Sequence, residues 1–326
     1  MPDWSRFVEL VRNHQRFLLT SHVRPDGDAL GSELAMAAVL ESLGKDVLVV
    51  NPFATPPGLQ FLDPAGKLKQ LGADVKAEQL DGYDVLIVLD TTAWAQLGVM
   101  GEVIRTTKAV KAVLDHHVSA DDLGAELFKD DEAEATGRLV VESADQLGVP
   151  LTLAIARPAF AAIATDTGWF RFSSTTPETL RMAARLMDVG VVPAELYQQL
   201  YENDTLPRLN LIGCTMARAK VEMDGRLIHT YIERRDFEAA GAHPADSEDM
   251  INMTLAVGGT EVAVILVEQQ SGGFKISFRS RNDFDCSLIA QQFGGGGHKK
   301  AAGAFIDEPL VAAQTKVLDA VRAAMR

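Results

Sequence analysis

Aspartates and histidines follow three apolar runs in the N-terminal half of the chain. They are His22, Asp26 and Asp28 after FLLTS (17–21), Asp90 after YDVLIVL (83–89), and Asp115, His116 and His117 after VKAVL (110–114). One further carboxylate, Asp166, ends an apolar helical pattern. Mixed imidazole and carboxylate donors suit Mn²⁺ or another divalent ion that accepts both nitrogen and oxygen ligands. These residues are therefore candidate metal ligands.

A metal centre would explain why so many carboxylates gather, because like charges raise one another's pKa unless cations neutralise them. Two divalent ions about 3.5–4 Å apart form a clamp for an in-line displacement at phosphorus. One ion lowers the pKa of a bound water, and both withdraw charge from the phosphoryl oxygens. Gly27 and Gly31 are expected to let the first loop turn tightly around the ions. The helix that follows would offer its N-terminal N–H groups to an anion.

Each segment also has a purely structural explanation. Pro-Asp-Gly-Asp at 25–28 is a common turn, and Asp90 with Thr91 could form a turn or a helix cap. The histidine pair could be structural, and Asp166 could merely end its helix. Four independent explanations of this kind would have to hold together in one domain. The joint pattern therefore favours a metal centre.

A glycine-rich segment, FGGGGHKKAAG (293–303), stands out in the C-terminal half. Four consecutive glycines are expected to preclude regular structure and to expose backbone N–H groups to phosphate oxygens. Basic side chains beside them would add charge, and an arginine at the end of FKISFRSR (274–281) could make a bidentate phosphate contact. The candidate phosphate-binding residues are Arg279, Gly295, Gly296, Gly297, His298 and Lys299, with Lys300 as an alternative to Lys299. A flexible linker is the competing interpretation, but a linker rarely needs His-Lys-Lys beside its glycines.

Apolar runs alternate with helical patterns in the first half, as in an α/β fold with a parallel sheet covered by helices. Strands are expected at 17–21, 46–51, 83–91 and 110–117, and helices at 29–43, 136–147 and 151–165, the last bent at Pro158. Ligand sites of such sheets lie outside the carboxyl ends of the strands. The candidate ligands should therefore converge there.

The second half is expected to be a smaller α+β domain. Strands are expected at 227–233, 261–269 and 274–281, and helices at 246–255, 285–292 and 310–325. Between 177 and 217 the pattern is mostly helical, with prolines suited to first turns. The expected division is a metal-binding domain at 1–187, a helical linker at 188–205 and a substrate-binding domain at 206–326.

Composition narrows the class of protein. The 326 residues carry a net charge of −14, of which −13 falls on residues 1–205. This charge argues against a general nucleic-acid binder, because such proteins use Lys and Arg to displace counterions. Cys214 and Cys286 are expected to be reduced thiols. No signal-peptide core and no stretch that could span a bilayer is expected, so a cytoplasmic protein without membrane contact is predicted.

The motifs resemble those of the DHH phosphoesterases. The match covers His22, Asp26 and Asp28, then Asp90, then Asp115-His116-His117, then Asp166. The segment around Arg279 and the Gly-Gly-Gly-Gly-His298 run resemble the DHHA1 domain that follows in one branch of the family. The order and spacing extend from about residue 14 to 306 without a departure at the motif positions. The chain is most similar to the two-domain group of nano-RNases (oligoribonucleases) and pAp phosphatases.

The resemblance implies a role for each of these residues. His22, Asp26 and Asp90 would hold one metal ion, and Asp28, Asp90, His116 and Asp166 the second. His117 would face the scissile phosphate, and Asp115 would orient the histidines. Arg279 and His298 would bind a substrate phosphate or nucleotide from across an interdomain cleft that forms the active site.

The implied activity is that of a phosphoric ester hydrolase with two divalent ions, Mn²⁺ foremost and Mg²⁺ or Co²⁺ as alternatives. It would hydrolyse short single-stranded oligoribonucleotides to mononucleotides and remove the 3′-phosphate of pAp. Linear dinucleotides derived from cyclic dinucleotides are alternative substrates. A pyrophosphatase is disfavoured by the glycine-rich segment, and a non-catalytic nucleotide-binding regulator by the full set of ligands. A homodimer is one candidate assembly.

Overall fold

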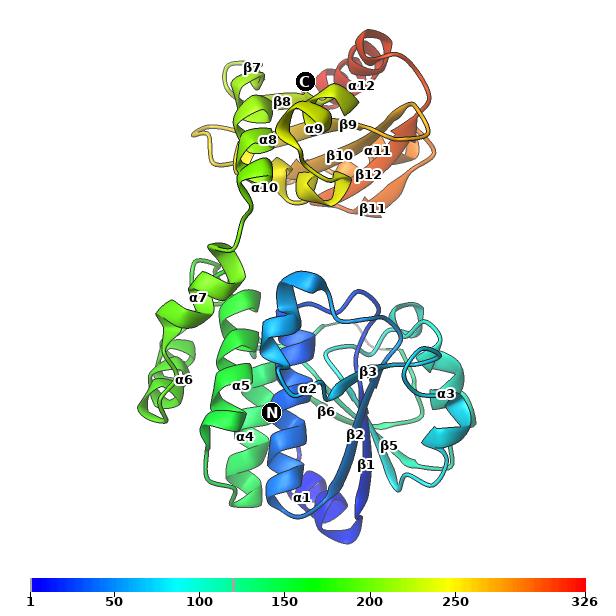
Figure 1. The fold of residues 1–326 in the computed structure, drawn as a ribbon, viewed down its shortest axis with the longest axis vertical. Helices are drawn as coiled ribbons and strands as arrows, with labels where there is room; N and C mark the ends of the chain where they lie inside the picture. Colours follow the sequence, from blue (N-terminus) through cyan, green and yellow to red (C-terminus); the bar gives the residue numbers. More distant parts are fainter. Residues whose placement is uncertain (1, 119–120) are drawn as a thin grey trace. The chain divides into compact units, whose positions relative to one another are not determined.

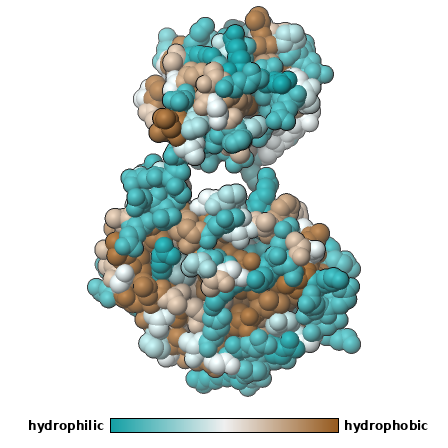
Figure 2. All heavy atoms as spheres, viewed as in Figure 1, coloured by the Kyte–Doolittle hydropathy of each residue, from teal (hydrophilic) through white to brown (hydrophobic). Residues whose placement is uncertain are grey.

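The parallel sheet expected in the N-terminal half is present in the computed structural model, which describes residues 2–118 and 121–326 (Figure 1). These residues form two compact units, and the division falls between Asn203 and Asp204. Each unit is built around one six-stranded sheet. Hydrophilic residues cover much of the face drawn in Figure 2. In the described part of the chain, no helix is both long enough and apolar enough to cross a membrane.

The sheet of the first unit has the strand order β3-β2-β1-β4-β5-β6, and all neighbouring strands are parallel. The strands are β1 (Arg16–Thr20), β2 (Asp46–Asn51), β3 (Leu68–Gln70), β4 (Val85–Leu89), β5 (Val110–Asp115) and β6 (Glu126–Lys129). The chain builds outward from β1 in one direction and then adds β4 on the other side of β1. The pair β1 and β4 therefore forms a topological switch point, next to which ligand sites of open α/β sheets lie.

Helices cover both faces of this sheet. One face is covered by α1 (Trp4–Asn13), α2 (Gly27–Ser42), α4 (Thr136–Leu147) and α5 (Leu153–Asp166), and the other by α3 (Met100–Thr106) (Figure 1). Successive side chains of a strand point to opposite faces, so Leu19 joins the first core and Leu18 the second. Strands that are buried on both faces need continuous apolar runs. The predicted parallel sheet covered by helices is confirmed.

The remaining elements of the first unit are two helices that come after the last strand in the sequence and three short 3-10 turns between strands. They are α6 (Pro177–Asp188), α7 (Pro193–Tyr201) and the 3-10 turns η1 (Pro57–Leu62), η2 (Ala77–Leu80) and η3 (Trp94–Gln96). The strands β3 and β6 were not predicted, because three or four residues carry too little periodicity to be recognised. Helix α1 was also missed, although Phe7, Leu10 and Val11 form a buried stripe along it.

The second unit has a mixed sheet with the strand order β11-β12-β10-β9-β8-β7, in which only β8 and β9 are parallel. Its strands are β7 (Lys220–Glu222), β8 (Leu227–Ile232), β9 (Val262–Glu268), β10 (Phe274–Ser280), β11 (Gly296–His298) and β12 (Ala301–Ile306). Its helices are α8 (Leu206–Ala217), α9 (Arg234–Ala240), α10 (Met250–Thr254), α11 (Cys286–Gln291) and α12 (Leu310–Ala324), with the turn η4 (Pro244–Ser247). Apolar side chains pack against both faces. The predicted α+β character is confirmed.

Two expectations for the second unit are wrong. The helix expected at 246–255 is divided into η4 and α10, because Asp249 adopts a left-handed conformation (φ 62°) between them. The glycine-rich segment is not irregular throughout, since β11 pairs with β12. A Cβ on Gly297 would lie 2.6 Å from the carbonyl oxygen of Ala301. Glycine therefore permits this close pairing instead of preventing it.

Gly27 and Gly31 do not form a turn, contrary to expectation, but belong to the first two turns of α2. A Cβ on Gly27 would lie 2.5 Å from Oγ1 of Thr165, and a Cβ on Gly31 would lie 2.4 Å from the carbonyl oxygen of Pro158. Both contacts are to α5. The glycines therefore allow α2 and α5 to pack closely, which brings the start of one helix beside the end of the other.

Glu33 carries a carboxyl group that is buried in the core of the first unit. Glu33 on α2 is fully buried, and its Oε2 accepts a hydrogen bond from Nδ2 of Asn51 at 2.7 Å. Burial raises the pKa of Glu33 to about 8, although hydrogen bonds from Asn51 and Ser21 act against this shift. The folded protein therefore holds a proton here that an unfolded chain releases at lower pH.

Substituting Gly31→Ala should destabilise the first unit by about 1–3 kcal/mol, the usual cost of overpacking a close contact. The matched control is Gly213→Ala in α8, where an added Cβ meets nothing within 4 Å. That change should stabilise the protein by roughly 0.4–1 kcal/mol, because alanine restricts the unfolded chain. Denaturant unfolding measures both. Equal effects from the two substitutions would contradict close packing at Gly31.

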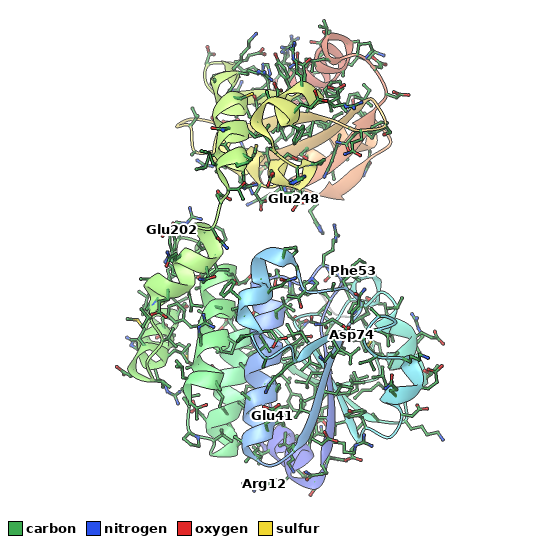
Figure 3. All side chains as sticks on the ribbon, viewed as in Figure 1. Arg12, Glu41, Phe53, Asp74, Glu202 and Glu248 are labelled. Carbon is green, nitrogen blue, oxygen red and sulfur yellow. The ribbon has the colours of Figure 1, made fainter. Side chains whose placement is uncertain are left out.

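Glu33→Gln should remove a pH dependence of stability. Because the folded pKa exceeds the unfolded value, the contribution of Glu33 is present at low pH and is lost as pH rises from about 5 to 8. The free energy of unfolding of the variant should fall less over this range, and at pH 8 the variant should be more stable by up to about 4 kcal/mol. Glu41→Gln, an exposed position on the same helix (Figure 3), is the control and should track the wild type.

Candidate metal centre

The candidate ligands of the first unit come from separate elements that meet beside the switch point. His22 and Asp26 follow β1, Asp28 lies in the first turn of α2, Asp90 follows β4, His116 follows β5, and Asp166 ends α5. Three groups of three have ligand atoms within 4.8 Å of one another: His22 with Asp26 and Asp90, Asp28 with His116 and Asp166, and Asp90 with His116 and His117. The structure thus brings together all six predicted ligands.

The first group surrounds one side of Asp90. Nε2 of His22 lies 3.3 Å from Oδ2 of Asp90 and 3.9 Å from Oδ1 of Asp26. Asp90 is buried and has a left-handed backbone (φ 64°), which is uncommon for a residue other than glycine and is concentrated at functional sites. Asp90 is therefore held in an unusual conformation with one carboxylate oxygen toward His22.

The second group lies on the other side of Asp90. Nε2 of His116 is 3.6 Å from Oδ2 of Asp28, 3.6 Å from Oδ1 of Asp90 and 3.7 Å from Oδ2 of Asp166. Asp90 therefore presents one oxygen to each imidazole.

Both imidazoles are oriented by backbone carbonyl groups. Nδ1 of His22 lies 2.9 Å from the carbonyl oxygen of Val23, and Nδ1 of His116 lies 3.1 Å from that of Ala133. A carbonyl can only accept, so Nδ1 carries a proton in each ring, and Nε2 is the nitrogen that faces the carboxylates. Histidines that bind metals are usually oriented by such a bond from the other ring nitrogen.

The N-terminus of α4 holds two of the carboxylates, a contact that was not predicted from the sequence. The backbone N–H groups of Thr136 and Gly137 donate to Oδ2 and Oδ1 of Asp28 at 2.8 and 2.9 Å. The hydroxyl group of Thr136 donates to Oδ1 of Asp90 at 3.0 Å. The positive end of the helix dipole also favours negative charge there. A Thr-Gly pair at a helix start was the available signal, but its partners are distant in sequence.

The expected anion site at the start of α2 is already occupied by the protein. Asp26 is the N-cap, and its Oδ1 accepts from the backbone N–H groups of Asp28 and Ala29 at 3.0 and 3.1 Å. These donors orient the Asp26 carboxylate. The expectation that they bind an external anion is therefore wrong.

Burial and the charges of neighbouring carboxylates make Asp90 and Asp166 hard to ionise without a counter-charge. Burial, together with the charges of Asp28 and Asp26, raises the pKa of Asp90 well above its usual value. Burial and the charge of Asp28 raise the pKa of Asp166 to about 6. Among the residues that the structure describes, the ion pairs of these aspartates involve histidines, not Lys or Arg. A divalent cation fits this donor set, because it supplies the missing positive charge.

Asp115 and His117 lie beside this cluster. Asp115 is fully buried, and its Oδ1 accepts from the backbone N–H and from Nδ1 of His117 at 3.1 and 2.8 Å. Burial alone would raise the pKa of Asp115, but hydrogen bonds from His117 and Lys129 outweigh burial and lower it to about 2. The hydrogen bond to Asp115 raises the pKa of His117. Lys129 and Thr92, which contact Asp115, carried no recognisable signal in the sequence.

The candidate phosphate-binding residues of the second unit lie at one end of its sheet. Arg279 on β10 and His298 on β11 are both paired with Ala301 on β12, so they occupy one row across three strands. Residues in one row of an antiparallel sheet project from the same face. His298 is exposed, whereas Arg279 is partly buried. Lys299 is exposed and lies 3.2 Å from Asp283.

A hollow of about 1290 Å³ opens on one face of this sheet. Its lining includes Lys275, Ser277 and Arg279 from β10, and Glu248 between η4 and α10 (Figure 3). Basic and acidic side chains are mixed around it. The hollow offers Arg279 an accessible space, but its charge alone does not define a polyanion site.

Comparison with known proteins assigns both halves of the chain. Residues 16–163 match the DHH family, N-terminal domain, and residues 224–326 match the DHHA1 domain. A protein of Thermus thermophilus named bifunctional oligoribonuclease and PAP phosphatase NrnA is 36% identical over 93% of this chain and 88% of its own. A protein of the same name from Bacillus subtilis is 27% identical over 92% of this chain and 93% of its own.

Solved structures share the fold. An exopolyphosphatase-related protein from Bacteroides fragilis has a TM-score of 0.88 at 24% identity, covering 98% of this chain and 94% of its own. The exonuclease RecJ bound to manganese has a TM-score of 0.55 at 15% identity, covering 99% of this chain and 94% of its own. The family matches and the relative from Thermus thermophilus confirm the resemblance to the DHH phosphoesterases. This chain belongs to the DHH family, in the branch with a DHHA1 domain that includes the bifunctional oligoribonuclease and PAP phosphatase NrnA of Thermus thermophilus.

Proposed function

We propose that this chain is a metal-dependent phosphoesterase that hydrolyses short oligoribonucleotides to mononucleotides and removes the 3′-phosphate of pAp. One observation carries the proposal: two oriented imidazoles place their Nε2 atoms against the two carboxylate oxygens of buried Asp90. The relatives named as oligoribonucleases and PAP phosphatases support the substrate class. The free thiols of Cys214 and Cys286 support action in the reducing cytoplasm.

Two divalent cations, foremost Mn²⁺, would occupy the centre. His22, Asp26 and Asp90 would hold one ion. Asp28, Asp90, His116 and Asp166 would hold the other. When bound, the ions supply Lewis acidity, which acidifies water and withdraws charge from the phosphoryl oxygens. Their charge also offsets the repulsion that raises the pKa of Asp90 and Asp166.

His117, Arg279 and His298 would bind and orient the substrate. His117 is half-exposed, and its Nδ1 is engaged by Asp115, which leaves Nε2 to donate to a phosphoryl oxygen. Arg279 would make a bidentate contact with a substrate phosphate, and His298 in the same row would add a donor. The first unit would thus carry out the chemical step, and the second would bind the nucleotide.

A substrate panel with added Mn²⁺ tests the proposed function. RNA of two to five nucleotides and pAp should be hydrolysed, with the rate per end falling as RNA lengthens. Linear dinucleotides, long RNA, pyrophosphate and cyclic dinucleotides complete the panel.

Asp90→Asn should lower kcat by orders of magnitude and reduce bound Mn²⁺, because one carboxylate is proposed to serve both ions.

The matched control for Asp90 is Asp115→Asn, which alters a buried aspartate one strand away. Its loss should be about 10–100-fold with metal content retained, as for groups that orient catalytic residues. Mild and equal losses from the two variants would contradict the two-ion assignment. Binding of nucleotides without turnover of any substrate would instead favour a regulatory protein.

Arg279→Ala should lower kcat/KM for pAp and dinucleotides by about 10- to 150-fold, because a charge-assisted hydrogen bond is worth roughly 1.5–3 kcal/mol. A small aryl phosphate ester, which lacks the nucleotide, should lose little. Bound Mn²⁺ should be unchanged. Lys316→Ala on α12, an exposed lysine paired with Glu308, is the charge-matched control. A similar loss on the small ester would show that Arg279 belongs to the catalytic step.

A further inference from the structure

Lys129 is an unusual lysine, because its side chain is largely buried at the end of β6. In the parallel sheet it is paired directly with Asp115 on β5. Its Nζ lies 3.0 Å from Oδ2 of Asp115 and donates to Oγ1 of Thr92 at 3.2 Å. A buried ammonium is costly unless it is paired and hydrogen-bonded, and here it meets both conditions.

Thr92 completes a closed triangle of contacts. Its hydroxyl group donates to Oδ2 of Asp115 at 3.0 Å, so this oxygen is held by both Lys129 and Thr92. The other oxygen, Oδ1, accepts from the backbone N–H and from Nδ1 of His117. With different groups on its two oxygens, the carboxylate is fixed in its rotation as well as in its position.

His117 depends on this carboxylate for its orientation. Its side chain is about half-exposed (49%), whereas that of Asp115 is completely buried. Its ring packs only obliquely against that of His116, with centroids 4.6 Å apart at 59°. Among the described residues, Nδ1 of His117 lies 2.8 Å from Oδ1 of Asp115 and 3.8 Å from Oδ1 of Asp90, so the shorter contact with Asp115 is the hydrogen bond that orients the ring and directs Nε2 away from Asp115.

We propose that Lys129 is a positioning residue for His117: together with Thr92 it fixes the Asp115 carboxylate, and that carboxylate fixes the imidazole. The role of His117 at the substrate rests on the function proposed above. A buried ion pair is weak evidence for stability, since apolar residues of similar volume often serve as well or better. The ion pair of Lys129 and Asp115 lies directly behind the half-exposed His117, and it is better explained by the orientation that it imposes on this imidazole.

The test compares Lys129→Met with Lys111→Met in the full-length, Mn²⁺-loaded protein. Lys111 lies near the opposite end of β5 and serves as the control. Lys129→Met should lower kcat on pAp by about 10–100-fold, the range for groups that orient catalytic residues. KM and bound Mn²⁺ should stay within about twofold of the wild-type values, because a purely positional effect acts on the chemical step. In an Asp115→Asn background, the same substitution should cost less than about twofold, because residues that act as a unit are not additive.

Thr92 provides an independent variant if Lys129→Met folds poorly. Thr92→Val removes the hydroxyl group at constant shape and should lower kcat in the same direction. Thr92→Ser retains the hydroxyl group and should restore kcat. Loss of bound Mn²⁺ in Lys129→Met, or equal losses with and without Asp115, would overturn the proposal.

Histidine ring ¹H–¹⁵N spectra of the metal-free protein need no turnover. The Nδ1–H signal that disappears in His117→Gln should be protected in the wild type and in Lys111→Met, and should be lost to solvent exchange in Lys129→Met. A wild type that hydrolyses none of the substrates would refute the proposed function, and the ring signal alone would then decide the role of Lys129. An unchanged signal would overturn it.

Discussion

Mutual repulsion among four aspartate carboxylates is the constraint on which the rest of this site depends. Asp90 lies at the centre, and the remaining three are Asp26, Asp28 and Asp166. Burial and the charges of Asp28 and Asp26 raise the pKa of Asp90, and burial and the charge of Asp28 raise the pKa of Asp166. The described residues around them supply N–H and O–H donors that orient these groups, and no Lys or Arg that neutralises them. Such a cluster is suited to binding cations.

The parallel sheet makes this concentration of charge possible. Reversal of strand order between β1 and β4 places the loops that follow both strands at one edge, and β5 adds a third loop. Close packing of α2 against α5, which Gly27 and Gly31 permit, brings Asp28 and Asp166 to the same place. The N-terminus of α4 then turns its N–H groups toward Asp28. The packing of α2 against α5 therefore decides how close the charged groups of Asp28 and Asp166 lie.

Positive charge is present nearby, but it is kept apart from the candidate ligands. Lys129 contacts Asp115, which is not among the proposed ligands, and that carboxylate in turn contacts His117. An ammonium group placed among the ligand carboxylates would compete with a cation for their oxygens. Placed behind Asp115, the same charge stabilises an ionised carboxylate that can hold an imidazole. The carboxylates of Asp26, Asp28, Asp90 and Asp166 thus face histidines, whereas that of Asp115 is held by Lys129.

The sequence by itself determined the types and order of the candidate ligands and the parallel sheet, because apolar runs and helical periods act over neighbouring residues. The run at 46–51 and the helical pattern at 136–147 coincide with β2 and α4. Only the tertiary structure decided which donors orient the aspartates: Thr136 is 108 positions from Asp28, and Thr92 is 23 positions from Asp115. No local pattern encodes such pairs. The glycine-rich strand β11 likewise formed because glycine admits a close backbone partner, which composition alone could not show.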